Sequence, residues 1–238
     1  MIYPLKLMLP VLNEKGIKYT EDTLNKLDKY AALLTEWNEK INLTAITDPE
    51  GIVIKHFLDC ALLLDKVEIP QNARVIDVGT GAGFPGLVLK IFRPDIKLVL
   101  LDGLNKRLVF LNEVANALGL TDVQTLHLRA EEAGRKPNFR EGFDLVTARA
   151  VARQNLLYEY CLPLTKVGGI FCAMKGPAAE TEVKESVAAG KLLGGAKPQI
   201  LTETLTGAET RTFVITKKIS QTPPKYPRVS AKIAKQPL

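Results

Sequence analysis

The chain has 238 residues, of which 46% are hydrophobic and 24% charged, with a formal net charge of +6. These values predict one or two folded domains with an apolar core and exclude a disordered chain. No apolar run reaches the ~20 residues of a membrane-spanning helix, and the apolar N-terminus lacks the features of a signal peptide, so we expect a soluble protein. The cysteines Cys60, Cys161 and Cys172 show no CxxC spacing. This argues against a zinc site or a disulfide framework and favours the cytoplasm.

The first third of the chain predicts helices only. Thr20 is a plausible cap for a helix over residues 20–44, in which apolar side chains recur every three or four residues. A second helix is predicted over residues 49–64, starting at Pro49. Because no strand pattern precedes residue 72, we expect residues 1–70 to form an N-terminal helical cap.

From residue 73 the pattern alternates between strands and helices. The clearest helix is Lys106–Leu118. The predicted strands are Arg74–Gly79, Lys97–Asp102, Val123–Leu128, Phe143–Ala148, Gly169–Met174, Gln199–Leu205 and Arg211–Lys217. The last two, joined by Thr206, Gly207 and Ala208, predict an antiparallel hairpin. Residues 71–218 are therefore predicted to be an α/β domain with a seven-stranded, mostly parallel sheet.

The C-terminal end is strongly basic. Residues 217–238 carry six Lys and Arg and no acidic residue, so the first 216 residues balance at 26 basic against 26 acidic. Two interpretations of the tail, residues 219–238, stay open: a solvated basic terminus, or an arm that binds a polyanion. In the second case Lys225 and Arg228 are candidate RNA contacts.

A glycine-rich loop follows the first predicted strand. Gly81, Gly83 and Gly86 satisfy GxGxxG, so a dinucleotide site must be weighed against other nucleotide-like ligands. Asp77 lies at the strand end, where its charge would repel a diphosphate but attract the ammonium and sulfonium groups of S-adenosylmethionine. We therefore favour ligand contact by Asp77 over a capping function.

Asp102 ends the next strand, 19 residues after Gly83. An acidic residue at about this distance binds ribose hydroxyls in nucleotide-binding βαβ folds. Capping of the helix that starts near Leu104 is compatible with ribose binding, and we expect both.

Several segments together resemble one known family. They include WNEKINLTAITDPEGIVIKHFLD, VIDVGTGAGFPGLVLKIFRPDIKLVLLDGLNKR, RAEE, VTARAVA, MKGPAAETEV and TPPKYPR. They resemble the RsmG family, also called glucose-inhibited division protein B, whose members methylate N7 of a guanine in small-subunit ribosomal RNA. The resemblance implies a Rossmann-like class I methyltransferase fold with S-adenosylmethionine as cofactor.

The resemblance also implies site residues. Gly79 and Phe84 would line the cofactor together with Gly81 and Gly83, Ala130 and Glu131 would contact its adenine end, and Arg149 would face its methionine end or the base. Lys55, His56 and Asp59 would form the inner edge of the RNA site, although His56 reads more simply as a packing residue. Phe84 has an alternative as a core residue, and Glu131 as a solvated residue at a helix start. His127 reads only as part of a core strand.

Some positions differ from the family pattern: Gly103 replaces the usual serine, Leu128 the usual glycine, and the tail continues differently after Arg228. The implied partner is 16S rRNA, a small subunit or an assembly intermediate, and the chain is expected to be a monomer. N7 of guanine carries a free lone pair, so no catalytic base and no metal are expected. Consistent with this, no Asn-Pro-Pro-aromatic or Pro-Cys motif follows the fourth predicted strand.

Overall fold

The computed structural model describes residues 2–205 and 210–238, and within these ranges it has a single seven-stranded sheet in the order β3-β2-β1-β4-β5-β7-β6. The strands are β1 Arg74–Val78, β2 Lys97–Asp102, β3 Val123–His127, β4 Phe143–Arg149, β5 Thr165–Lys175, β6 Gln199–Thr204 and β7 Thr210–Lys217. Strands β1 to β5 are parallel, whereas β7 pairs antiparallel with both β5 and β6. The predicted sheet and hairpin are confirmed, although the predicted turn at residues 206–208 lies outside the described residues.

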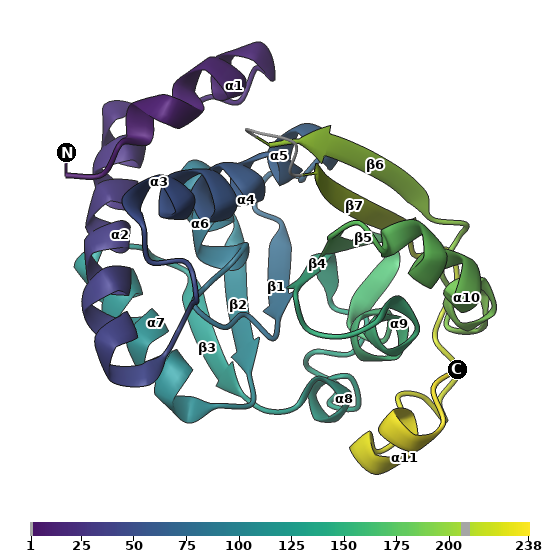
Figure 1. Cartoon of the computed structure of the whole chain (residues 1–238). Helices are drawn as coiled ribbons and strands as arrows, with labels where there is room; N and C mark the ends of the chain where they lie inside the picture. Colours follow the sequence, from purple (N-terminus) through teal and green to yellow (C-terminus); the bar gives the residue numbers. More distant parts are fainter. Residues whose placement is uncertain (1, 206–209) are drawn as a thin grey trace.

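Helices cover both faces of the sheet (Figure 1). The N-terminal ones are η1 Leu5–Met8, α1 Leu9–Glu14, α2 Glu21–Ile41, α3 Pro49–Gly51, η2 Ile52–Leu58, α4 Asp59–Ala61 and α5 Leu63–Lys66. The others are α6 Gly86–Phe92, α7 Asn105–Ala117, α8 Ala130–Ala133, α9 Gln154–Cys161, α10 Ala179–Leu192 and α11 Ser230–Lys235. Among these described elements, no helix has both the length and the apolar character needed to cross a membrane.

The two faces of the sheet have separate apolar cores, because side chains alternate along each strand. Val75 of β1 packs in a core with the N-terminal helices, α6 and α7. Its neighbour Ile76 packs in a second core with α9 and α10. The N-terminal helices therefore share their core with the sheet.

Helix α2 begins at the predicted cap but ends at Ile41, three residues before the predicted end at residue 44. The Thr20 hydroxyl accepts a hydrogen bond from the backbone N–H of Thr23, and Thr23 reciprocates in a capping box. The helix ends before Asn42, which has a left-handed φ of 49°. The predicted helix over residues 49–64 is also helical, but its central segment η2 is a π-helix. Lys55 and His56 lie in this π-helix, and Asp59 follows it as the first residue of α4.

The C-terminal residues return to the body of the molecule. After β7 the chain passes α9, and α11 packs against that helix (Figure 1, yellow). Ile233 of α11 is fully buried. The segment predicted as a basic tail thus has an ordered place on the second face of the sheet.

Candidate cofactor-binding and active site

A cavity of about 340 Å³ opens at the carboxyl ends of strands β1 to β4. It lies where the strand order reverses direction, between β1 and β4, the usual ligand position in open α/β sheets. Its walls are Val78, Gly79, Leu101, Asp102, Gly103, Leu128, Arg129, Ala130, Glu131, Val151, Ala152, Leu156, Tyr160 and Ser230.

The glycine loop forms one wall of this cavity, and its Gly79, Gly81 and Gly83 all have a positive φ. Gly79 has φ +65°, and a Cβ there would lie 2.7 Å from Cγ2 of Val151. Its backbone N–H donates to the Leu101 carbonyl at 2.8 Å, which ties the loop to β2. Gly81 has φ +58°, and its N–H donates to Asp102 Oδ2 at 3.0 Å. Gly79 lines the cavity, whereas Gly81 lies behind Asp102.

Helix α2 supports the same loop from the other side. A Cβ on Gly83 would lie 2.5 Å from the Tyr30 hydroxyl. That hydroxyl donates a hydrogen bond to the carbonyl oxygen of Ala82. Gly83 therefore serves close packing of α2 against the loop and does not line the cavity.

Asp77 lies beneath the loop and does not line the cavity. Its Oδ2 accepts from the Thr80 hydroxyl at 2.6 Å and the Gly86 N–H at 3.1 Å, and its Oδ1 accepts from the Thr147 hydroxyl at 2.8 Å. Burial raises the pKa of the Asp77 carboxyl to about 6, although these hydrogen bonds oppose the shift. The predicted electrostatic contact between Asp77 and a ligand does not match this position, and we interpret Asp77 as the anchor of the loop.

Asp102 makes the contact to the start of α7 that the sequence predicts. Its Oδ1 accepts from the Leu104 N–H at 2.9 Å, which orders the start of α7, and its Oδ2 accepts from Gly81 and from Arg107 at 3.0 and 3.3 Å. A carboxylate has about four acceptor positions, so three bonds leave capacity for one more. Since Asp102 also lines the cavity, that position is available to a ligand hydroxyl.

The far wall consists of α8 and α9. Ala130 and Glu131 both line the cavity, and Glu131 is buried, contrary to its alternative as a solvated residue. Leu156 and Tyr160, one turn apart on α9, face the same space. Sequence reasoning missed these two residues and Ser230, because no local motif marks them.

His127, predicted to be in the core, is exposed, with its ring nitrogen 3.1 Å from the Gly103 carbonyl oxygen.

Arg149, Phe84, His56 and Asp59 meet beside the glycine loop, outside the cavity wall. The buried Phe84 ring stacks on the His56 ring at a centroid distance of 4.4 Å, and the Arg149 guanidinium lies 4.8 Å from the centre of the Phe84 ring. Arg149 Nη1 donates to Asp59 Oδ2 and to the Lys55 carbonyl, at 3.0 and 3.1 Å. Arg211 donates to the other Asp59 oxygen at 2.7 Å. The structure thus brings Phe84, Arg149, His56 and Asp59 together as one cluster.

His56 is neutral in this cluster. Burial, and then the positive charge of Arg149, lower the pKa of His56 to about 3. Arg149 Nη2 is 3.0 Å from Nδ1, and a guanidinium can only donate, so Nδ1 is the acceptor. The proton is therefore on Nε2, which donates to the Thr44 hydroxyl at 2.8 Å. With 6% of its surface exposed, His56 is a packing residue that orients Arg149.

The two tail residues predicted as RNA contacts differ in their surroundings. Lys225 is exposed, with its ammonium 5.3 Å from the centre of the Tyr226 ring. Arg228 instead pairs with the buried Glu159, its Nε and Nη2 lying 2.8 and 2.6 Å from the two carboxylate oxygens. This pairing leaves Lys225 as the accessible member of the two.

The sheet order, the cavity at the reversal point and the acidic end of β2 define a Rossmann-like class I methyltransferase fold. An S-adenosylmethionine-dependent O-methyltransferase from Thermotoga maritima superposes with a TM-score of 0.57 over 80% of this chain and 72% of its own, at 15% identity. A predicted O-methyltransferase from Agrobacterium tumefaciens gives a TM-score of 0.52 over 65% and 77%, at 20% identity. At these identities the likeness establishes the fold alone.

The sequence comparisons identify the family. The model of the rRNA small subunit methyltransferase G family, GidB, matches residues 23–209. Proteins named ribosomal RNA small subunit methyltransferase G are 49% identical in Desulforamulus reducens, over 94% of both chains, and 47% identical in Clostridium perfringens, over 98% of both. The chain belongs to this family of S-adenosylmethionine-dependent methyltransferases. Family membership, and not the position of Asp77, is what excludes the dinucleotide alternative.

Proposed function

We propose that this protein transfers the methyl group of S-adenosylmethionine to N7 of a guanine in bacterial 16S rRNA. The single observation that supports this cofactor site is the cavity where the strand order reverses. Gly79 has no side chain to fill this cavity, and Asp102 retains an acceptor position there. A volume of about 340 Å³ suits a nucleoside-sized ligand, since ligand cavities span ~300–1,000 Å³. The family membership of the chain supports the choice of RNA as substrate.

The residues present fit this cofactor. Asp102 would accept a hydrogen bond from a ribose hydroxyl, and Ala130 with Glu131 would border the adenine. Arg149 uses three donors on Lys55, Asp59 and His56, which leaves two of its five N–H groups for the methionine carboxylate or an RNA phosphate. Gly81, Gly83, Phe84 and Asp77 would act indirectly by holding the loop and Arg149 in place.

The bound cofactor supplies an electrophilic methyl group on a positively charged sulfur. The methyl carbon would pass from sulfur to the lone pair of guanine N7, and S-adenosylhomocysteine and a cationic 7-methylguanine would be the products. N7 bears no proton at neutral pH, so the protein must align the two reactants and exclude water. Because N7 has no proton to lose, no base is required, and the stacking of His56 on Phe84 fits a packing function.

The proposed setting of the reaction is the cytoplasm, with the protein acting as a monomer on 16S rRNA, a small subunit or an assembly intermediate. Three buried free cysteines fit a reducing compartment. The proposed RNA contacts are Lys55 and the exposed Lys225. The Lys55 carbonyl, together with His56 and Asp59, positions Arg149. Light scattering of the purified protein would test the monomeric state.

Methyl transfer to small subunits that lack the modification is the direct test. Labelled methyl groups, followed by nucleoside analysis, should yield 7-methylguanosine. Parallel reactions with naked 16S rRNA and with candidate small molecules test the alternative that another RNA or a small molecule is the substrate. Asp102→Ala should weaken S-adenosylhomocysteine binding by roughly 10- to 100-fold through lost charge-assisted hydrogen bonds. Asp95→Ala, at the opposite end of β2, should bind normally.

The dependence of the methyl-transfer step on pH tests the N7 assignment. Single-turnover rates should be nearly flat between about pH 6.5 and 8.5, because no essential base titrates there. The pKa of His56, about 3, lies far below this range. A tenfold rise with pH would indicate a nucleophile that must lose a proton, such as guanine N1.

A further inference from the structure

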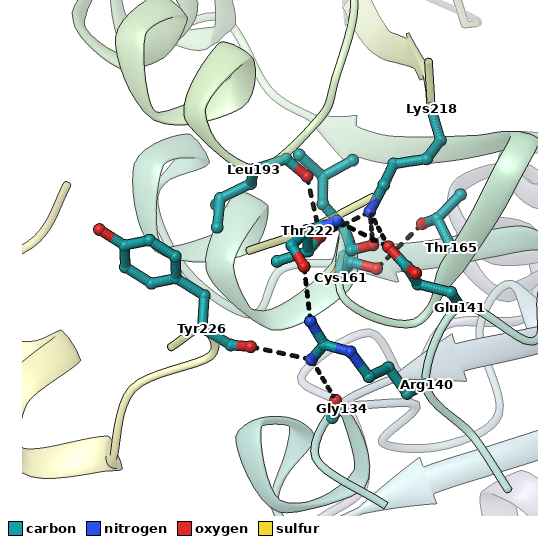
Figure 2. Close-up of polar contacts among 10 residues, drawn as sticks. Gly134, Arg140, Glu141, Cys161, Thr165, Leu193, Lys218, Thr222 and Tyr226 are labelled. Atoms are coloured by element: carbon teal, nitrogen blue, oxygen red, sulfur yellow. Dashed lines mark hydrogen bonds and ion pairs between the residues drawn. The ribbon is translucent and has the colours of Figure 1, made fainter. Parts of the chain in front are cut away.

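The C-terminal residues 218–228, here called the strap, are fixed to the domain by buried polar contacts (Figure 2). The fully buried Lys218 donates to the Leu162 carbonyl at 2.5 Å and to the Thr222 hydroxyl at 2.6 Å, and it pairs with Glu141 at 3.2 Å. Arg140 donates to the carbonyl oxygens of Thr222 and Tyr226 at 2.7 and 2.8 Å. Because Lys218 is fully buried and acts inside the protein, it cannot serve as a surface contact for a polyanion.

A second group of polar contacts lies at the end of the strap. Glu159 on α9 is 1% exposed, and it accepts hydrogen bonds from the backbone N–H, Nε and Nη2 of Arg228. Arg135 donates to the carbonyl oxygen of Pro227 at 2.8 Å. A buried ion pair of this kind gives little net stability but strongly penalises separation, so it holds one arrangement of the strap.

The Glu159–Arg228 ion pair and the cavity wall share helix α9. Glu159 binds the strap, while its neighbour Tyr160 lines the cavity. Directly after the strap, Ser230 begins α11 and lines the same cavity. Ile233, fully buried, keeps α11 on α9, and Leu238 packs against the core of this face. The strap therefore delivers Ser230 to the cavity in a defined position.

We infer that the C-terminal segment is a structural wall of the cofactor site, with Ser230 and α11 closing the adenosine side of the cavity next to Tyr160. This inference rests on the proposed function for the identity of the ligand, an S-adenosyl nucleoside. It assigns a binding residue to a part of the chain whose composition alone suggested an RNA arm. The exposed Lys232 and Lys235 lie on this wall, but they do not line the cavity.

Ser230→Phe and Ala231→Phe form a matched pair for the test. Both positions are exposed at the start of α11, but only Ser230 lines the cavity. Ser230→Phe should weaken S-adenosylhomocysteine binding at least tenfold by filling the cavity, whereas Ala231→Phe should bind within twofold of the wild type. Calorimetry measures both affinities, and thermal unfolding confirms that the variants are folded.

A truncation after Val229 gives an independent readout. It removes Ser230 and α11 but keeps the Arg228–Glu159 pair, so the domain should stay folded while the affinity falls roughly 5- to 20-fold. Wild-type affinity in both Ser230→Phe and the truncated chain would overturn the inference. A wild-type protein that binds no S-adenosylhomocysteine would instead overturn the proposed function, which keeps the two failures distinct.

Discussion

Asp77 and Asp102 end neighbouring parallel strands, yet their surroundings separate their functions. Asp77 is enclosed by Thr80, Gly86 and Thr147, so it stabilises the loop from below. Asp102 keeps one side toward the cavity. The sequence placed both carboxylates correctly at strand ends, but it could not distinguish them, because burial depends on what the following loop covers.

Asp77→Asn tests the buried carboxyl through stability. Asparagine can keep every contact if its carbonyl faces Thr80 and Gly86 and its amide donates to Thr147. The pKa of Asp77 is raised to about 6 in the folded state, so the folded protein binds this proton more tightly than the unfolded chain. The resulting stabilisation is complete below the ordinary pKa of Asp and is lost as the pH rises through about 6. A tenfold difference in proton affinity is worth ~1.4 kcal/mol. Between pH 4 and 7 the free energy of unfolding of the wild type should therefore fall by up to about 3 kcal/mol relative to that of the variant.

Urea unfolding at several pH values in this range measures that difference. Asp95→Asn is the control, because Arg93 lowers the pKa of Asp95 to about 2 and its contribution is constant from pH 4 to 7. Parallel stability curves for Asp77→Asn and the wild type would refute the assignment of a raised pKa to Asp77.

A comparison of Gly79→Ala with Gly81→Ala distinguishes the effect of backbone strain on ligand binding from the effect of a blocked cavity. Both positions have a left-handed φ, so each substitution should destabilise the fold by about 1 kcal/mol. Only at Gly79 would the new methyl group also collide with Val151 in the cavity wall. We expect a larger loss of S-adenosylhomocysteine affinity in Gly79→Ala than in Gly81→Ala, measured by calorimetry. Equal losses would mean that loop strain alone controls binding.

At the scale of elements, α9 connects the cofactor cavity to the C-terminal strap. Tyr160 faces the cavity, and the adjacent Glu159 holds Arg228. The sequence contains no local pattern that pairs residues 159 and 228, since the pairing depends on the path of the chain after β7. Such long-range ion pairs become visible only when the fold brings the two segments together.

A double-mutant cycle on Glu159 and Arg228 tests this connection. Arg228→Met alone leaves a buried carboxylate unpaired and should lower the free energy of unfolding by about 3–5 kcal/mol. Glu159→Gln combined with Arg228→Met removes both charges and should recover much of that loss. Denaturant unfolding gives the coupling, and additive effects of the two changes would show that the pair is not formed in solution.

At the scale of the whole molecule, the positive charge of the C-terminal segment divides into internal and surface groups. Lys218 and Arg228 are engaged inside, whereas Lys225, Lys232 and Lys235 are exposed. Deletion of residues 219–238 would therefore leave Glu159 unpaired and take the Thr222 N–H from Glu141, as well as remove charge. Substitution of the exposed lysines is the cleaner test of RNA binding.

The triple substitution Lys225→Ala, Lys232→Ala and Lys235→Ala should weaken RNA binding and leave cofactor affinity unchanged. Each phosphate contact contributes roughly 0.7 to 0.9 to the log–log salt slope, so the slope should become shallower by ~2 to 3. Filter binding of 16S rRNA fragments at several salt concentrations measures it. Lys97→Ala, at the amino end of β2, serves as the control, and an unchanged slope in the triple variant would exclude these lysines as phosphate contacts.

Local patterns were sufficient for the seven strands, the helical N-terminal third, the glycine loop and Asp102, because hydrophobic periodicity and turn residues act over a few positions. Family motifs added Ala130, Glu131 and the cluster around Arg149. Folding alone settled three matters: Asp77 lies beneath the loop, the His56 ring packs on Phe84, and Ser230 lines the cavity at the ends of strands β1 to β4. Each depends on burial or on an ion pair between residues far apart in the chain, and such contacts exist only once the segments are packed together.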